Sequence, residues 1–386
     1  MKVLKTNNII IKSWCNELED GAIEQATNVA ELPFAFRQVA LMPDTHQGFG
    51  MPIGCVLATK GIIIPNAVGV DIGCGMLACK TSLTEINTDQ IKSIMGLIRK
   101  SVPVGFDKRK EKQEIKPFET PLDETPLVRE QFEKARYQIG TLGGGNHFIE
   151  LQKGSDGHIW FMIHSGSRNL GYTVAGHYNK LAVSLNEKWF SSVGKNKELA
   201  FLPTDTEEGQ NYIKEMNSCQ DFAKQNRDLM AKYILESIKE VMGDDTTSLS
   251  EHNAHHNFAR LEHHFMQNVW VHRKGATSAK EGEMCIIPGS QGTKSYIGMG
   301  LGEKESFMSC SHGAGRKMGR KAAQRDLNLE EEIKKLNDQG IVHGIRHIKD
   351  LDEASGAYKD IDVVMEEQKD LVRILVELTP LGVVKG

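Results

Sequence analysis

The sequence has no apolar stretch near the roughly 20 residues that a helix needs to cross a lipid bilayer. Residues 1–14 alternate apolar and polar side chains and lack the long apolar core and small-residue cleavage site of a secretion signal. We therefore expect a first β-strand in this segment. We also expect a protein of the cytoplasm with no membrane partner.

A pattern of paired cysteines is also missing. The 7 cysteines are an odd number scattered through 386 residues, and none of them forms a CxxC pair. A disulfide framework is therefore not expected, and at least one thiol is free to bind metal. The formal net charge of -4 gives no general attraction to phosphate backbones, so a nucleic-acid partner would need a local basic cleft.

Three common motifs of nucleotide and metal enzymes are absent. The chain has neither the GxxxxGK[ST] phosphate loop nor the HExxH zinc motif. It also lacks the KxDG motif of lysine-dependent nucleotidyl ligases. If the protein carries a nucleotide, a different side chain must hold it.

What is present is typical of a globular α/β protein, with 39% hydrophobic and 25% charged residues. Between residues 38 and 80, short apolar runs alternate with Gly, Pro and Asn, which predicts short strands and tight turns. Other patterns predict strands at 160–163 and 283–287, helices at 212–242 and 316–336, and a long surface loop at 104–126. Neither a repeat nor a low-complexity linker interrupts the chain, so we expect one domain over residues 1–386.

Histidines are numerous, and their clustering is the first sign of metal chemistry. Of 14 histidines, six lie in one window: His252, His255, His256, His263, His264 and His272. If residues 251–264 are helical, His252 and His256 lie one turn apart on one face. Most of these side chains would face solvent or lie behind the metal ligands, and the simplest hypothesis is a single metal ligand, His256.

Two further segments place metal-binding side chains beside glycine. Asp71 and Cys74 lie three residues apart on a glycine-flanked turn that can bring both to one ion, and a thiolate can bridge two ions. A buried structural cysteine with a capping aspartate remains an alternative. Residues 140–147 (GTLGGGNH) let backbone amides approach an anion, and Asn146 and His147 follow directly. A plain tight turn is the alternative there.

Two other histidines follow predicted strands or lie among very small residues. His164 ends a predicted strand, and Arg168 after it offers a guanidinium suited to phosphate. His312, in the sequence SHGAGR (311–316), has neighbours small enough to leave room for a covalent adduct. A structural histidine at 164 and a helix-capping turn at 312 remain alternatives.

Taken together, the ordered motifs resemble the RtcB family of RNA-splicing ligases along essentially the whole chain. They comprise MPDTH (42–46), VGVDIGCG (68–75), GTLGGGNHFIE (140–150), HSGSR (164–168), HN (256–257), HRKGA (272–276), PGS (288–290), SHGAGR (311–316), AYKD (357–360) and Lys385-Gly386. The resemblance implies one α/β domain, with mixed β-sheets flanked by helices around a central metal and nucleotide cleft.

The resemblance also implies two manganese ions. Cys74 would bridge them, His164 and His256 would complete the site of one ion, and Asp71 and His147 that of the other. Thiolate and imidazole donors suit a first-row transition metal far better than magnesium.

By the same resemblance, His312 would attack the α-phosphorus of GTP while Asp44 orients its ring. The guanylate would pass to an RNA 3'-phosphate, derived where necessary from a 2',3'-cyclic phosphate, and an RNA 5'-hydroxyl would displace it. Arg168 would hold RNA phosphate. The residues implied around the nucleotide are Asn146, Phe148, Glu150, Asn257, Pro288, Ser290, Ser295, His312, Gly313, Ala314, Gly315, Tyr358 and Lys385.

The chain departs from the family pattern at Gln291, where Met is usual, and at Gly319, where Ser is usual. It is also shorter than the better-known bacterial and archaeal members, which is compatible with a specialised bacterial paralogue that repairs one cleaved RNA. Two rival functions stay open: a binuclear metal-dependent RNA-end phosphatase or cyclic phosphodiesterase, and a non-catalytic metal- or RNA-binding protein. The physiological RNA, the oligomeric state and the need for an activating protein partner are open as well.

Overall fold

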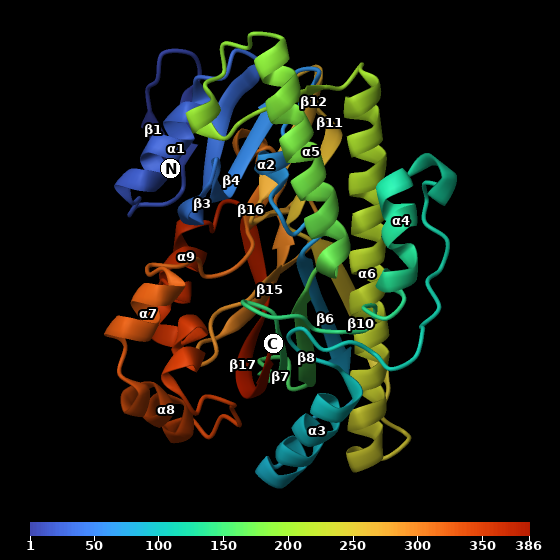
Figure 1. Ribbon diagram of the computed structural model, residues 1–386. Coiled ribbons are helices and arrows are strands. Elements are labelled where there is room, and N and C mark those ends of the chain that lie inside the picture. Colours follow the sequence, from blue (N-terminus) through green and yellow to red (C-terminus); the bar gives the residue numbers. More distant parts are fainter.

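Two large β-sheets form the centre of the protein, and helices cover their outer faces (Figure 1). The computed structural model describes residues 1–386. The smaller sheet has six strands, and only its β2–β3 pair is parallel. In spatial order its strands are β1 (Lys2–Leu4), β2 (Ile10–Ser13), β3 (Ala35–Phe49), β4 (Met51–Thr59), β12 (Gln267–Lys274) and β11 (Asn257–His264).

The larger sheet has seven strands, all antiparallel to their neighbours. In spatial order they are β10 (Ser248–His255), β6 (Gly75–Thr81), β8 (Ile159–Ser165), β7 (Phe148–Gly154), β17 (Val372–Lys385), β15 (Ser295–Gly300) and β14 (Met284–Ile287). The strands predicted at 160–163 and 283–287 are confirmed as parts of β8 and β14. Two small sheets pair β13 (Ala276–Ser278) with β16 (Ser309–Ser311) and β5 (Ile62–Ile63) with β9 (Leu202–Pro203).

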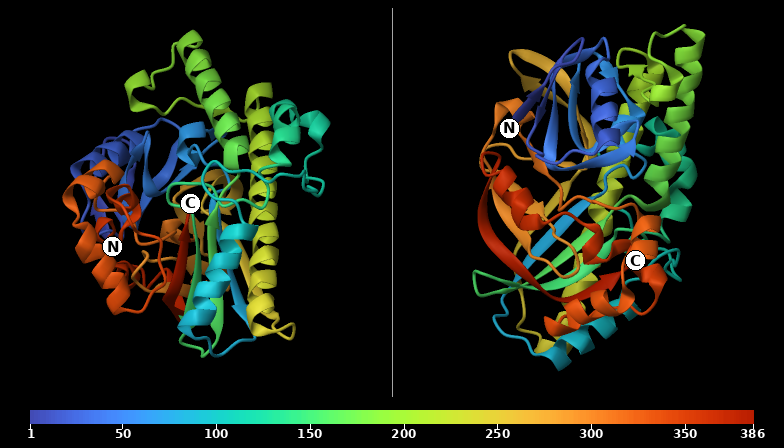
Figure 2. Two further views of the ribbon diagram at one scale, coloured as in Figure 1. Left: turned by 60° about the horizontal axis from the view of Figure 1, so that its bottom comes forward. Right: turned by 90° about the vertical axis from the view of Figure 1, so that its left-hand side faces the viewer.

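The helices pack on the sheets through apolar faces. On the larger sheet, Ile94 and Ile98 of α3 and Ile234 of α6 join Leu77 and Phe161 in one buried cluster. Figure 2 shows the two sheets one above the other, with α5 and α6 along one side. The α-helices are α1 (Asp20–Ala30), α2 (Pro65–Val68), α3 (Thr88–Ser101), α4 (Pro126–Ala135), α5 (Arg168–Lys188), α6 (Glu207–Met242), α7 (Arg320–Asp326), α8 (Leu329–Asp338) and α9 (Ile361–Glu367). Short 3-10 turns occur at Leu122–Glu124, Lys195–Lys197, Lys304–Ser306, Ile348–Glu353 and Ser355–Ala357.

The mixed α/β fold that the sequence indicated is confirmed. The helix predicted at 212–242 is α6, which begins earlier because the side chain of Thr206 caps it by accepting from the Gly209 amide at 3.2 Å. The segment 104–126 is a long loop as predicted, apart from the 3-10 turn and Pro126, the first residue of α4. None of the helices combines the length and the apolar character that crossing a membrane demands.

The N-terminal segment begins with a strand as predicted, β1, and a second strand, β2, follows it because the polar residues between them make a turn in which Thr6 donates to the Ile9 carbonyl. The helix predicted at 316–336 is broken into α7 and α8, because the Asn328 side chain accepts from the amides of Glu330 and Glu331 and starts a new helix.

Residues 251–264 are strands and not a helix, so the helical spacing considered for His252 and His256 does not apply. Strand β10 pairs with β6 in the larger sheet, and β11 pairs with β12 in the smaller one. His256 is the single residue between β10 and β11, so the chain passes from one sheet to the other at this histidine. Its backbone is fixed there, since its amide donates to the Cys74 carbonyl at 2.8 Å.

Candidate active site

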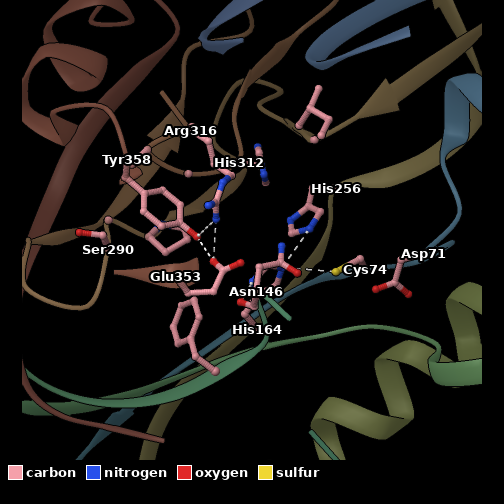
Figure 3. Close-up of a pocket in the computed structure, with 18 of the residues that line it drawn as sticks. Asp71, Cys74, Asn146, His164, His256, Ser290, His312, Arg316, Glu353 and Tyr358 are labelled. Atoms are coloured by element: carbon pink, nitrogen blue, oxygen red, sulfur yellow. Dashed lines mark hydrogen bonds and ion pairs between the residues drawn. The ribbon is translucent and has the colours of Figure 1, made fainter. Parts of the chain in front are cut away.

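A cleft with a cavity of about 280 Å³ opens where the two sheets meet, and most of the predicted site residues line it. They come from strand ends and connecting loops, far apart in the sequence but adjacent in space (Figure 3). The predicted residues that line the cleft are Asp71, Cys74, Asn146, Phe148, Glu150, His164, His256, Asn257, Pro288, Ser290, His312, Gly313, Ala314, Gly315, Tyr358 and Lys385.

Five potential metal donors converge at one end of this cleft. The Sγ atom of Cys74 lies 3.5 Å from His147 Nε2 and 3.3 Å from His164 Nε2. Nε2 of His164 lies 3.3 Å from Nε2 of His256, and Nε2 of His147 lies 3.1 Å from Oδ2 of Asp71. The donors therefore form two groups that share Cys74, each with its ligand atoms within 4.8 Å of one another.

The protonation of these rings suits a cation between them. A carbonyl can only accept, so Nδ1 of His164 carries the proton in its 3.1 Å bond to the Asn146 carbonyl, and Nε2 presents a lone pair. Burial lowers the pKa of His164 and of His256 well below the ordinary value, so both rings are neutral at neutral pH. Burial, with the charge of Asp71 second, raises the pKa of the Cys74 thiol, which a bound cation would reverse.

The start of β6, directly after Cys74, can lie close to β10 only because residue 75 is a glycine. The Cα of Gly75 faces β10 so closely that a Cβ on it would lie 2.1 Å from the Ala254 carbonyl oxygen. Any larger residue would push β6 and β10 apart. The approach of these two strands places Cys74 beside His256.

His312 lies in the middle of the cleft, next to the donor cluster. Its Nδ1 donates to Oδ2 of Asp44 at 2.7 Å, and its backbone amide donates to the same oxygen at 3.1 Å. Asp44 is fully buried behind the ring. With Nδ1 held as a donor, Nε2 carries the lone pair and makes no hydrogen bond within the protein. The His312 and His256 ring centres are 4.8 Å apart.

The wall of the cleft away from the metal donors is rich in polar groups. Figure 3 shows Ser290, Arg316 and Tyr358 on this side, with His312 between them and the cysteine-histidine cluster. Nη1 of Arg316 lies 3.2 Å from the Tyr358 hydroxyl and 3.1 Å from Oε2 of Glu353. The Tyr358 hydroxyl donates to Glu353. This network fixes the side chains that border the space beside His312.

A second buried carboxyl group lies deeper in the same wall. Burial raises the pKa of Glu150 to about 8, although the hydrogen bond from Gln152 and the charge of Lys385 oppose the shift. The amide of Gln152 donates to Glu150 at 2.5 Å. Burial lowers the pKa of Lys385, whose ammonium group lies 5.6 Å from the centre of the Phe148 ring.

Comparison with known proteins identifies the family. The family profile described as "tRNA-splicing ligase RtcB" matches residues 25–125 and 117–386. The chain is 38% identical to "RNA-splicing ligase RtcB" of Escherichia coli K12, in an alignment that covers 100% of this chain and 99% of that protein. It is 32% identical to "tRNA-splicing ligase RtcB" of Thermococcus kodakarensis, with 95% of this chain and 92% of that protein covered. The chain belongs to the RtcB family.

Four residues predicted for the site do not line the cleft of this RtcB protein. His147 and Asp44 lie behind Asp71 and His312, to which they are hydrogen-bonded. Ser295 is buried and accepts from the Gly289 amide at 3.2 Å, so it supports the loop that carries Ser290. Arg168 lies behind the metal donors, and its role in binding RNA phosphate stays a prediction.

The Arg168 guanidinium is held by the protein itself. It donates to the Thr141 hydroxyl at 3.1 Å and to the Gly105 carbonyl at 3.0 Å. It also lies so close to the glycine loop that a Cβ on Gly143 would be 1.9 Å from Nη1. Arg168 therefore braces the segment that leads to His147.

Several residues line the cleft that the sequence did not single out. His46, Lys274 and Arg316 were inside quoted motifs, so position in a motif was the signal that could have identified them. Glu353 had no such signal, because it lies in a short 3-10 turn without a motif. Gln291, the departure from the RtcB pattern, is buried and donates to the Glu353 carbonyl at 2.9 Å, which ties two walls of the cleft together.

Proposed function

We propose that this protein is a GTP- and Mn²⁺-dependent RNA ligase that joins 3'-phosphate or 2',3'-cyclic phosphate ends to 5'-hydroxyl ends. Family membership supports the coarser part of this statement, RNA ligase activity. The observation that carries the finer part is His312, whose Nδ1 is bound to Asp44 while Nε2 opens into the cleft beside the donor cluster. A binuclear hydrolase would need the metal donors, but it would not need a histidine whose free Nε2 is oriented toward the cleft as a nucleophile.

The donor set supports a pair of manganese ions. His164, His256 and Cys74 would hold one ion, and Asp71, His147 and Cys74 the other. Buried imidazoles facing each other and a thiol favour a transition metal over magnesium. Bound there, the ions would neutralise the charge that develops on the phosphates.

The side chains then have distinct parts in the first step. Asp44 holds the imidazole so that Nε2 of His312 attacks the α-phosphorus of GTP; a phosphorus–nitrogen bond forms, and the bond to pyrophosphate breaks. Tyr358, Ser290 and Glu150 line the same cleft and would bind and orient the guanosine. The small residues Gly313 and Ala314 leave space for the adduct.

Two further transfers complete the proposed reaction. An oxygen of the RNA 3'-phosphate attacks the guanylate, the phosphorus–nitrogen bond breaks, and His312 is restored. The 5'-hydroxyl then attacks the RNA phosphorus, loses its proton, and releases GMP as the phosphodiester forms. A 2',3'-cyclic phosphate would first be hydrolysed to the 3'-phosphate in the same cleft. Because donors from residues 71 to 256 and the nucleophile at 312 share one cleft, we propose that residues 1–386 work as one domain.

Sealing of defined RNA ends tests the proposal against the rival hydrolase. Purified protein with manganese and GTP should join an RNA 3'-phosphate to a 5'-hydroxyl, and His312→Ala should not. His312→Ala should still bind manganese, since His312 is outside the two donor groups. Dephosphorylation or cyclic-phosphate opening without sealing, retained in His312→Ala, would favour the rival instead.

A further inference from the structure

Three exposed apolar side chains lie on segments that adjoin the metal donors, and one of them, Val70, also lines the cleft. The Phe106 side chain is fully exposed, and Tyr172 and Val70 are 64% and 55% exposed. A single exposed apolar residue needs no explanation, because much of any protein surface is apolar. Three of them on segments that adjoin one cluster of metal donors do need one.

The contacts of their neighbours place Phe106 near Arg168 and Tyr172 near both Arg168 and the segment that carries Asp71. Gly105, next to Phe106, donates its amide to the Gly143 carbonyl at 2.9 Å and accepts from Arg168 at 3.0 Å. Tyr172 lies one helical turn after Arg168 on α5. The preceding Gly171 packs so tightly that a Cβ on it would be 3.1 Å from the Ile72 carbonyl oxygen, next to Asp71.

The loop that presents Phe106 is anchored in the protein. Arg109 donates to the carbonyls of Ile139 and Gly140 at 3.1 and 2.7 Å, and its guanidinium lies 4.1 Å from the ring centre of Tyr233. The backbone is therefore held while the Phe106 ring stays uncovered. An aromatic ring held in the open by a fixed loop is suited to contact a ligand face to face.

The charge around Phe106 indicates which ligand. Of the four basic side chains in residues 106–112 (FDKRKEK), Arg109 is bound to backbone carbonyls and Lys112 pairs with Glu133 at 2.6 Å, which leaves Lys108 and Lys110 for a ligand. Lys108 and Lys110 are exposed. Exposed aromatic rings among cations are the combination that binds single-stranded nucleic acid, because bases stack on the rings while the cations contact phosphates.

We propose that Phe106 and Tyr172 form a stacking platform for unpaired nucleotides adjoining the RNA end that is joined at the metal centre. The proposal rests on the RNA ligase function proposed above and adds a substrate class to it. The substrate would have single-stranded ends, since bases in a duplex are not free to stack on protein. Base-paired RNA ends would not contact Phe106 and Tyr172 in this way.

Binding of a fluorescein-labelled single-stranded RNA with a 3'-phosphate tests this, with manganese present and GTP absent. Phe106→Ala and Tyr172→Ala should each weaken binding by about tenfold, within the range for loss of one base–aromatic stack. Phe106→Trp should bind like the unchanged protein, and Phe106→Leu should bind like Phe106→Ala, because leucine keeps apolar area but has no aromatic face. A blunt RNA duplex of equal length should bind all of them alike.

Phe190→Ala is the matched control. Phe190 is 94% exposed but lies beyond the far end of α5, a helix of 21 residues, which places it roughly 30 Å from Arg168. It should bind RNA unchanged. Undiminished binding by Phe106→Ala and Tyr172→Ala, equal losses on the duplex, or full binding by Phe106→Leu would each overturn the platform.

The same preparations separate this proposal from the proposed function. If the unchanged protein seals RNA ends but the alanine variants bind single strands as it does, only the platform is wrong. If the unchanged protein neither binds nor seals RNA, the ligase function itself is wrong, and the platform with it.

Discussion

The orientation of the His312 ring depends on a single buried carboxylate. Oδ2 of Asp44 accepts both the ring Nδ1–H and the backbone amide of His312, which fixes the tautomer and the orientation of the ring. An asparagine has nearly the same shape but can present an N–H donor, which would favour the tautomer with the proton on Nε2. That tautomer is not nucleophilic at the atom facing the cleft.

We therefore expect Asp44→Asn to transfer the guanylate to His312 at least about 100-fold more slowly, as when a carboxylate that orients a catalytic histidine is lost. The rate can be followed with labelled GTP in single-turnover experiments. Asp244→Asn, at an exposed position, is the control and should react normally. An unchanged rate in Asp44→Asn would show that the carboxylate does not orient the ring.

Glu150 should make GTP binding depend on pH. Its pKa is raised to about 8, so the carboxyl group is mostly protonated at neutral pH and ionised only above about pH 8. Two guanine N–H donors need the ionised form. GTP affinity should therefore rise between pH 6 and pH 8, by up to about tenfold per pH unit, and level off above.

Dissociation constants measured in a His312→Ala background avoid the covalent step. Replacing Glu150 by Gln there removes the titrating group and should flatten the profile. If the profile were flat with Glu150 present, the carboxyl group would not contact the guanine in the way we propose.

At the scale of elements, the loop after β16 is shaped around Asp44. Gly315 has a φ of +72°, and a Cβ on it would lie 2.3 Å from the Asp44 carbonyl oxygen. Gly315→Ala must therefore move the loop that carries His312. We expect a loss of about 1–3 kcal/mol in the free energy of unfolding and a larger loss of guanylate transfer.

Gly319→Ser is the matched control in the same segment. Nothing lies within 4 Å of a Cβ at Gly319, which is the N-cap of α7, where serine is favourable. It should keep both stability and transfer, measured by chemical denaturation and labelled GTP. A stable, active Gly315→Ala variant would contradict the argument from backbone shape.

Elements with a strong apolar repeat could be predicted from the sequence. Elements that form only through pairing with a distant strand or through one capping side chain could not. The apolar repeat predicts α6, whereas the histidine spacing alone leaves a helix open at residues 251–264. Their histidine spacing fits a helical turn, but pairing of β10 with β6 and of β11 with β12 outweighs local periodicity. The break between α7 and α8 depends on one capping side chain, Asn328, which periodicity does not detect.

At the scale of the whole molecule, one cluster is assembled from distant segments. The motif resemblance implies a shared site for Asp71, Cys74, His147, His164 and His256, and the structure arranges their ligand atoms in two groups that share Cys74. The resemblance does not identify Glu353, which lines the cleft because a 3-10 turn places it beside Tyr358. The resemblance also does not show that the chain passes from one sheet to the other at His256.

Because Cys74 is shared by both donor groups, its loss should affect metal binding more than the loss of a histidine that belongs to one group. Cys74 belongs to both donor groups, so Cys74→Ala should lose both manganese ions, whereas His256→Ala should keep the ion held by Asp71, Cys74 and His147. Metal content per chain after equilibrium dialysis would measure this. Equal losses in the two variants would contradict a bridging role for Cys74.

The central claim is that a nucleotide is carried by His312. Incubation with GTP and manganese, followed by peptide mass spectrometry under non-acidic conditions, would locate any adduct. We predict a GMP adduct on the peptide that contains His312, absent in His312→Ala. A guanylate found on a lysine, or no covalent adduct in a protein that still seals RNA, would contradict the account.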